Sequence, residues 1–213
     1  MHPILNKLKR RLIEISYKNN LIHVGSGLSC LETLYNIYKN KKESDICILS
    51  AGHAAIALYT VLEEMYPHIN AQELYKKHGV HPNRDSDNKI DFSSGSLGIG
   101  ITAAVGFALS DKKRHVYCVI SDGECYEGSV WESLRFINEN KMSNITIYVI
   151  INGNSATDYI DTDYLKNRLY SFYKNIKLIE MESYNLPYLM GIDAHYHSIT
   201  EQEYSELMLL LKD

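Results

Sequence analysis

Two short polar motifs carry the most distinctive chemistry in this sequence, Asp122-Gly123 and Asn152-Gly153-Asn154. A carboxylate, a side-chain amide and a backbone carbonyl together offer three oxygen ligands, which is the kind of set that Mg²⁺ prefers. Gly123 has no Cβ, so the backbone there can pass close to a diphosphate. Each motif taken alone is more often an ordinary turn. Together they predict a metal site that holds a diphosphate.

The segments around these motifs predict how they are brought together. Apolar runs at residues 115–121 and 145–151 are predicted to be strands, and residues 129–140 between them have the pattern of a helix. Neither run alternates polar with apolar residues, which is typical of a parallel sheet covered on both faces. Ligands of such sheets bind outside the carboxyl ends of the strands. We therefore expect Asp122 and Asn152 to converge at one edge of the sheet.

The rest of the chain predicts the same alternation of strands and helices. Apolar residues recur at helical spacing in several segments, short apolar runs indicate strands, and a polar stretch with Gly, Pro and Asn indicates a loop. Helices are expected at residues 4–17, 31–38, 54–66 and 201–211, a glycine-rich entry to a helix at 94–109, strands at 45–50 and 178–181, and a loop at 74–92. These elements predict an α/β fold, a single three-layer α/β/α domain with a mainly parallel sheet over residues 1–213.

Composition excludes several classes of function. The chain has 213 residues, 45% of them hydrophobic, and a formal net charge of -4, which does not favour a nucleic-acid partner. No apolar run is long enough for a membrane span, and no signal peptide is evident. The four cysteines match neither a zinc motif nor a secreted disulfide framework, so free thiols are expected. We therefore expect a soluble cytoplasmic protein.

The segment SDGECYEGSVWE at 121–132, followed by Asn-Gly at 152–153, resembles the thiamine-diphosphate fingerprint of transketolases. The resemblance implies a thiamine-diphosphate-binding fold of the diphosphate-binding (PP) type. It also implies thiamine diphosphate with Mg²⁺, or Ca²⁺ or Mn²⁺ in its place. The metal would bind Asp122, Asn152 and the backbone carbonyl of Asn154, with Gly123 and Glu124 beside the cofactor. Ser121 stands where the family usually has glycine.

Three histidines match the same family in order: His23 in HVGSGLS, His53 in LSAGHAA and His81 in GVHPN. Each alone is more often a surface or packed histidine than a catalytic one. By the resemblance they would line the substrate channel and donate hydrogen bonds to sugar hydroxyls and to a developing oxyanion. His81 is the weakest match, because Val80 precedes it where the family has glycine.

The resemblance implies roles for further residues, and each of these roles has an alternative. SGSLGIG at 94–100 is similar to a glycine-rich family motif whose backbone lies along the cofactor, which would involve Gly95, Leu97 and Gly98; close helix packing is the alternative. His195 in GIDAHYH would reach the diphosphate, although His197 competes for that role. Glu127 would act in catalysis at a subunit interface, or it would only favour the dipole of the helix that it begins.

The resemblance implies a two-chain enzyme. In this family a second, pyrimidine-binding domain supplies the glutamate that activates the cofactor, and we expect it on a partner chain in an α₂β₂ assembly. The expected reaction is transfer of a two-carbon ketol unit from a ketose or ketose phosphate to an aldose. The alternatives are a deoxyxylulose-phosphate-synthase-like enzyme, a two-chain decarboxylase and a non-catalytic subunit that binds the cofactor. The short excursion between Asn152 and His195 indicates that the acceptor differs from that of central metabolism.

Overall fold

The computed structural model describes residues 3–155, 158–180, 187–189 and 191–211. A four-stranded parallel sheet lies at its centre, with the strands side by side in sequence order. The strands are β1 (Ile46–Leu49), β2 (Val116–Ser121), β3 (Ile145–Ile151) and β4 (Lys177–Glu180). The predicted parallel α/β architecture is confirmed.

Strand residues alternate between two apolar clusters, one on each face of the sheet. On β2, Val119 belongs to the first cluster, whereas Cys118 and Ile120 belong to the second. Because both faces of β1, β2 and β3 are covered, these three strands need no polar alternation. On β4, Lys177 and Glu180 are exposed. This double burial explains the continuous apolar runs in the sequence.

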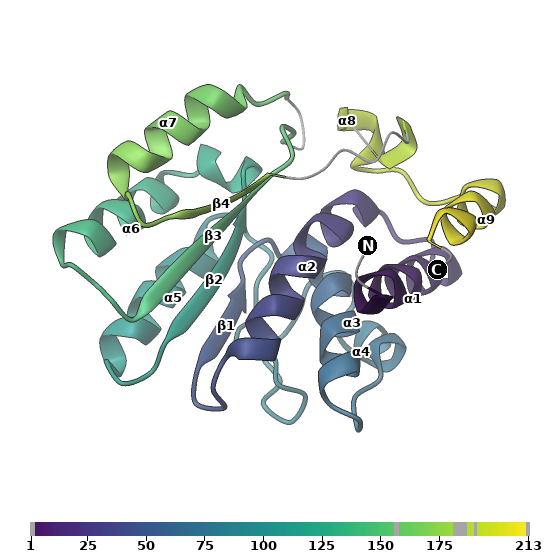
Figure 1. Cartoon of the computed structure of the whole chain (residues 1–213), viewed down its shortest axis with the longest axis horizontal. Helices are drawn as coiled ribbons and strands as arrows, with labels where there is room; N and C mark the ends of the chain where they lie inside the picture. Colours follow the sequence, from purple (N-terminus) through teal and green to yellow (C-terminus); the bar gives the residue numbers. More distant parts are fainter. Residues whose placement is uncertain (1–2, 156–157, 181–186, 190, 212–213) are drawn as a thin grey trace.

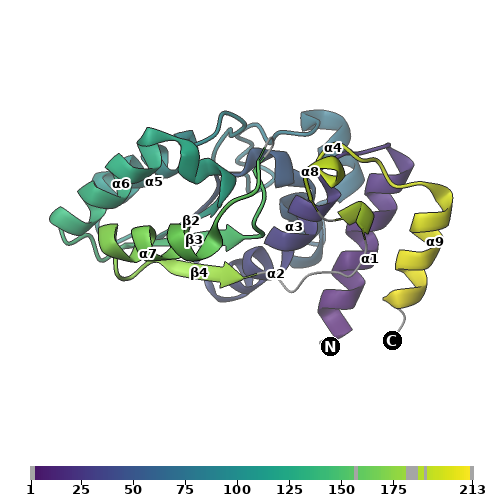
Figure 2. The same cartoon turned by 90° about the horizontal axis from the view of Figure 1, so that it is seen from above.

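Helices cover the two faces in two groups (Figures 1 and 2). Buried residues of the first group share a cluster with one face of the sheet, and those of the second group share a cluster with the other. The first group comprises α1 (Pro3–Lys18), α2 (Val24–Asn40), α3 (Ala55–Met65), α4 (Ala71–His78) and α9 (Glu201–Leu210). The second comprises α5 (Ile99–Ser110), α6 (Gly128–Glu139) and α7 (Thr162–Phe172).

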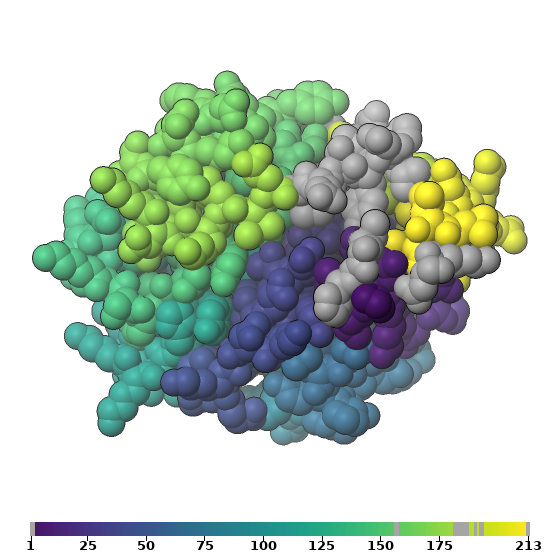
Figure 3. Space-filling view, viewed as in Figure 1, coloured from purple at the N-terminus to yellow at the C-terminus, as the bar shows by residue number. Residues whose placement is uncertain are grey.

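The last described helix packs against the first. Tyr17 and Tyr204 stack with ring centroids 4.5 Å apart, and α1 and α9 lie side by side in both ribbon views (Figures 1 and 2). In the space-filling view, α2 lies between this pair and α7 (Figure 3). The C-terminal helix α9 therefore lies beside the N-terminal helix α1.

Residues 74–78 differ from their prediction as a loop, because they complete α4. Asn70 caps this helix by accepting a hydrogen bond from the Glu73 backbone N–H, and Leu74 is buried beneath it. The stretch 79–95 that follows is irregular, as expected, apart from an isolated bridge between Asp85 and Ile90. Of the predicted strand at 178–181, the last residue lies outside the described residues.

Two negative expectations can be compared with the described part of the chain. None of its helices is both long and apolar enough to cross a membrane. All four cysteines, which lie within it, are buried free thiols, as predicted from their spacing.

Candidate active site

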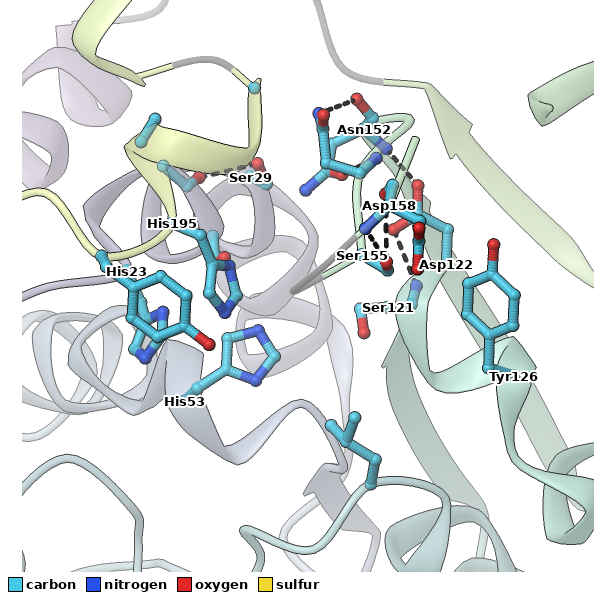
Figure 4. Close-up of a pocket in the computed structure, with 18 of the residues that line it drawn as sticks. His23, Ser29, His53, Ser121, Asp122, Tyr126, Asn152, Ser155, Asp158 and His195 are labelled. Carbon is cyan, nitrogen blue, oxygen red and sulfur yellow. Dashed lines mark hydrogen bonds between the residues drawn. The ribbon is translucent and has the colours of Figure 1, made fainter. Parts of the chain in front are cut away.

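A cavity of about 610 Å³ lies outside the carboxyl ends of the strands, as the positions of the polar motifs predict. Most of the predicted site residues line it. They are His23, His53, His81, Gly95, Leu97, Asp122, Gly123, Glu127, Asn152, Asn154 and His195. Gly98 and Glu124 do not line it. Figure 4 shows two groups across the cavity, with histidines on one side and the Asp122 and Asn152 loops on the other.

Asp122 connects the ends of two neighbouring strands. It follows β2, and its Oδ2 accepts hydrogen bonds from the backbone N–H groups of Asn152 (2.8 Å) and Gly153 (2.7 Å), which follow β3. Its Oδ1 accepts from the Gly123 N–H at 3.0 Å. Burial raises the pKa of Asp122 to about 6, although these N–H groups act in the opposite direction. The side chain is therefore fixed at the junction of the two motifs.

The loop after β3 turns its polar groups toward each other. The Asn152 side-chain oxygen accepts from the Asn154 N–H at 2.9 Å, and the Asn154 side-chain nitrogen donates to the Asn152 carbonyl at the same distance. Gly153 has a φ of 80°, which only glycine adopts without cost. The Oδ1 atom of Asn154 is buried and has no hydrogen-bond partner in the described structure. A buried, unpaired acceptor is costly unless a ligand satisfies it.

These residues fit a hard divalent cation beside a phosphate. No cluster of three or more His, Cys, Asp or Glu side chains suited to a metal occurs among the described residues, so amide and backbone oxygens have to complete any ligand set. Asp122, Asn152 and Asn154 offer such oxygens. A Cβ on Gly123 would lie 3.4 Å from the Ser155 Cα and 3.8 Å from the Asn154 carbonyl oxygen. Glycine at this position therefore keeps the space between the two loops open.

Three histidines cluster on the opposite wall. The ring centroid of His23 lies 4.2 Å from that of His195 and 5.3 Å from that of His53. Burial lowers the pKa of His23 to about 4 and that of His53 to about 3, and it also lowers that of His195. The three imidazoles are therefore neutral at physiological pH. Neutral imidazoles can both donate and accept hydrogen bonds, as recognition of hydroxyl groups requires.

The backbone of His23 is held in an unusual conformation. His23 has a φ of 62° at the start of α2, a left-handed conformation that non-glycine residues seldom adopt. Its N–H donates to the His195 carbonyl at 3.2 Å, and its Nδ1 is buried with no partner in the described structure. Such strain is typical of functional sites, where the surrounding structure maintains it.

His81 and Gly95 are positioned by close contacts between segments that lie apart in the sequence. A Cβ on Gly95 would lie 3.3 Å from the His81 ring, and one on Gly52 would lie 2.7 Å from the Gly95 nitrogen. The Ser94 N–H also donates to the Pro82 carbonyl at 3.1 Å. Gly52 is absent from the residues predicted from sequence, because its importance depends on a contact with a distant segment that no local pattern reveals.

His195 and His197 lie in different environments. His195 lines the cavity, whereas the His197 ring pairs with Glu203, Nε2 to Oε2, at 2.8 Å. The structure therefore favours His195 as the histidine that can meet a ligand.

Glu124 and Gly98 meet behind the cavity wall. Glu124 is 0% exposed, and its carboxylate accepts hydrogen bonds from Ser50, Gly98 and Ser121. Burial raises its pKa, while these hydrogen bonds act in the opposite direction. Direct contact of Glu124 with a ligand, implied by the sequence resemblance, has no support in this geometry.

Two exposed apolar side chains that line the cavity, Leu97 and Tyr126, and the nearby Ile99, which does not line it, form an exposed apolar group that no sequence pattern predicts. Tyr126 is 64% exposed, Ile99 49% and Leu97 36%. Leu97 and Tyr126 also line the cavity, as does the neighbouring Glu127. We call Leu97, Ile99 and Tyr126 the apolar rim.

Comparison with known proteins finds relatives over most of the chain. A family model described as 1-deoxy-D-xylulose-5-phosphate synthase matches residues 1–202. The chain is 30% identical over 173 residues to the 6-deoxy-6-sulfo-D-fructose transketolase subunit SqwG of Clostridium sp. (strain MSTE9), covering 72% of this chain and 63% of that protein. It is 29% identical over 162 residues to one of the subunits of apulose-4-phosphate transketolase from Phocaeicola vulgatus, covering 67% and 57%. The chain thus spans less than two thirds of the length of either relative.

Solved structures show the same fold. Transketolase from Leishmania mexicana superposes with a TM-score of 0.76 at 14% identity, covering 98% of this chain and 40% of that chain. Transketolase from Campylobacter jejuni gives a TM-score of 0.72 at 19% identity, covering 96% and 42%.

Proposed function

The chain belongs to the family of N-terminal domains that 1-deoxy-D-xylulose-5-phosphate synthase shares with transketolases, and on this premise we propose that it is the diphosphate-binding subunit of a transketolase-like transferase. The proposed reaction transfers a two-carbon ketol unit from a ketose or ketose phosphate to an aldose. One observation carries the proposal: the Asp122 carboxylate binds the backbone of the Asn152 loop, so that the two predicted ligand motifs meet at one point.

The two walls of the cavity would have different roles in the proposed reaction, and the first role is to bind the metal and the cofactor. Asp122, Asn152 and the Asn154 carbonyl would hold Mg²⁺, or Ca²⁺ or Mn²⁺, and Gly123 would leave room for the diphosphate. The backbone of Gly95 and Leu97 would lie along the cofactor, and His195 would reach the diphosphate from the histidine wall opposite. Thiamine diphosphate, when bound, supplies the nucleophilic carbon that allows a bond between two carbon atoms to be cleaved and re-formed.

The opposite wall would recognise the sugar. His23 and His53 are neutral and partly exposed to the cavity, so each can donate one hydrogen bond and accept another. His81, on the segment that packs against Gly95, would add a third donor. These donors would orient the substrate hydroxyls and stabilise negative charge that develops on the carbonyl oxygen.

A partner chain is the second part of the proposal. Two relatives are named as subunits of transketolases, and this chain covers only 40% of a solved transketolase. We infer that residues 1–213 act as the diphosphate-binding domain. A C-terminal-type subunit would carry the pyrimidine-binding domain and the catalytic glutamate, in an α₂β₂ assembly. Glu127 and the apolar rim would face this partner. The free, buried cysteines fit a reducing cytoplasm.

Co-expression tests this proposal. The chain is produced with the product of its neighbouring gene, and ketol transfer is measured for each chain alone and for the pair, with Mg²⁺ and thiamine diphosphate. Turnover is expected only from the pair. Turnover by this chain alone would contradict the split arrangement. An active pair that contains Asp122→Ala would instead indicate a subunit that binds no cofactor needed for catalysis.

One observation favours a second candidate, since the matching family model is described as 1-deoxy-D-xylulose-5-phosphate synthase. That activity would use pyruvate as donor. Glu127-Gly128 and Trp131-Glu132 resemble the transketolase form of the motif and favour ketol transfer. Supplying the purified pair with pyruvate and an aldose phosphate decides between the two, because product formation from pyruvate would reverse our preference.

A further inference from the structure

Glu124 is a buried carboxylate that joins three separate segments of the site. Its Oε1 accepts from the Ser50 hydroxyl at 2.6 Å and from the Gly98 N–H at 3.0 Å, and its Oε2 accepts from the Ser121 N–H at 3.0 Å. Ser50 directly follows β1, Ser121 ends β2, and Gly98 ends the glycine-rich stretch before α5. With 0% exposure, the side chain cannot reach the cavity.

Ser121 and Glu124 bind each other reciprocally. The Glu124 N–H donates to the Ser121 hydroxyl at 3.3 Å, while the Glu124 carboxylate accepts from the Ser121 N–H. This is the hydrogen-bond pattern of a capping box, in which a Ser and a Glu three positions later satisfy each other's backbone donors. Asp122 and Gly123 lie between them. The pair therefore fixes the turn that presents Asp122 to the cavity.

At its other end, Glu124 fixes the stretch that contains Gly95 and Leu97. Gly98 has a φ of 75°, and the Ser129 hydroxyl donates to its carbonyl at 3.0 Å. A Cβ on Gly98 would lie 2.7 Å from the Glu127 Cβ, so the stretch sits directly against the start of α6. The Glu124 carboxylate is the acceptor that the Gly98 N–H meets in this conformation.

We propose that Glu124 is a positioning residue that holds both walls of the diphosphate cradle, acting through Gly98 on one side and through the Ser121–Asp122 turn on the other. The inference rests on the proposed function for its ligand. It assigns Glu124 no contact with that ligand. A carboxylate suits this task because its two oxygens can accept hydrogen bonds from all three donors. A glutamine would turn an N–H₂ group toward one of them.

The first test is made on the whole chain without any ligand. Backbone amide hydrogen exchange is followed by NMR in the wild type and in Glu124→Gln, with β3 amides as an internal reference. Exchange at Gly98 and Ser121 is expected to accelerate roughly tenfold or more, since the carboxylate oxygens that accept from these N–H groups are replaced by an amide, which has only one oxygen. Unchanged exchange at both positions, with the β3 amides also unchanged, would overturn the proposal.

The second test uses two variants that keep the carboxylate. Ser50→Ala removes the hydroxyl donor, and Ser121→Ala removes the hydroxyl that forms one half of the capping box. Thiamine diphosphate affinity with Mg²⁺ is expected to fall about tenfold in Glu124→Gln and about threefold in each serine variant, in step with the exchange at Gly98. In the assembled pair, saturating cofactor should restore kcat in Ser50→Ala. Thr60→Val, which removes a buried hydroxyl that donates to the Ile56 carbonyl of its own helix, should match the wild type.

The outcomes separate the possible explanations. Glu124→Gln could bind thiamine diphosphate more weakly while its amide exchange, and the affinity of both serine variants, stay at the wild-type level. That result would indicate direct contact between Glu124 and the ligand and would overturn the positioning role. If Glu124→Gln does not fold, the two serine variants decide, and wild-type exchange and affinity in both would overturn the proposal. If the wild type binds no thiamine diphosphate, the proposed function fails, whereas the exchange experiment still decides whether Glu124 fixes these segments.

Discussion

His53 illustrates how burial sets the chemistry of individual residues in this site. Its pKa is lowered to about 3, first by burial and then by the neighbouring His23 and His195. At physiological pH it therefore presents a neutral ring to the cavity. A charged ring would repel the cation that we propose on the opposite wall, so neutrality suits both the sugar and the metal.

The lowered pKa of His53 predicts how stability depends on pH. In the unfolded chain the imidazole has its ordinary pKa near 6.5, so on acidification the unfolded state takes up the proton first. The free energy of unfolding should therefore fall as the pH decreases from about 6.5 toward 3. His53→Gln removes this contribution, and its stability should fall less over the same range, as measured by urea denaturation at about pH 7 and about pH 4.5.

The exposed His68 provides a matched control for this experiment. His68→Gln should retain the pH dependence of the wild type. If His53→Gln lost as much stability on acidification as the wild type, the neutral, buried state of His53 would be refuted.

Residues with local signals are predictable from the sequence, and those with distant partners are not. Asp122 and Asn152 can be placed together because parallel strands end at the same edge. Gly52 and Ser50 carry no such signal, since their importance comes from contacts with residues 94–100 and with Glu124. The buried position of Glu124 is also not predictable, because DGE after a strand is equally compatible with a side chain that faces the cavity.

At the scale of elements, the irregular segment after α4 depends on Asp85 for its position. Asp85 accepts hydrogen bonds from Lys77 at 2.7 Å, Asn88 at 2.8 Å and the His78 ring at 3.1 Å. Burial would raise the pKa of Asp85, but these hydrogen bonds outweigh it and lower the pKa to about 2. The carboxylate thus ties the end of α4 to the segment that carries His81.

Asp85→Asn should loosen this segment without unfolding the sheet. We expect a loss on the order of 2 kcal/mol in the free energy of unfolding, because hydrogen bonds to a charged group are weakened. In the assembled pair, KM for the sugar should rise several-fold through displacement of His81, while cofactor affinity changes little. The exposed Asp87, in the same segment, gives the control Asp87→Asn. Equal KM values for both variants and the wild type would show that this anchor does not position His81.

Helices with a strong apolar pattern follow from the sequence, and short or polar ones do not. The predicted loop at 74–92 overlaps the end of α4, because AQELYKKH buries only Ala71 and Leu74. No helix is predicted at α7, because its two buried residues, Leu165 and Leu169, are too few to mark a helical face among polar neighbours. Tertiary packing and the caps at Asn70 and Asp161 decide these helices, and neither follows from local pattern alone.

At the scale of the whole molecule, α5 presents an apolar surface on its open side. Its sequence IGITAAVGFALS contains no charged residue, and Ile99 and Leu109 are 49% and 47% exposed. Ile99 belongs both to α5 and to the apolar rim, whose other members Leu97 and Tyr126 line the cavity. Exposed apolar surface next to a site marks a place where another protein can bind. This location agrees with the proposal that the partner completes the cavity from this side.

Ile99→Asp tests this arrangement. An acidic residue in the first turn of α5 is compatible with the helix dipole, so the chain should keep its thermal stability. Co-purification with the partner subunit should be lost or reduced at least about tenfold, because a buried, unpaired carboxylate opposes association. Leu209→Asp, at a residue of α9 that is 61% exposed, is the control and should assemble normally. Equal assembly of both variants would exclude this face as the interface.

The three-layer arrangement can be predicted because β1, β2 and β3 are apolar on both faces, but the order of the strands cannot. Their order β1-β2-β3-β4 and the packing of α9 against α1 depend on contacts between distant segments. The cavity itself is therefore a property of the whole molecule, although its residues lie in recognisable motifs.

Calorimetric titration of the chain, by itself and with its partner, with thiamine diphosphate in the presence of Mg²⁺ or of a chelator tests the central claim most directly. Binding should require the metal in the wild type, be lost in Asp122→Ala and Asn152→Ala, and persist in Asp163→Ala, at a carboxylate on α7 whose side chain is 88% exposed. Wild-type affinity in both site variants, or binding that is indifferent to the chelator, would contradict the assignment of these strand ends as the metal and diphosphate site.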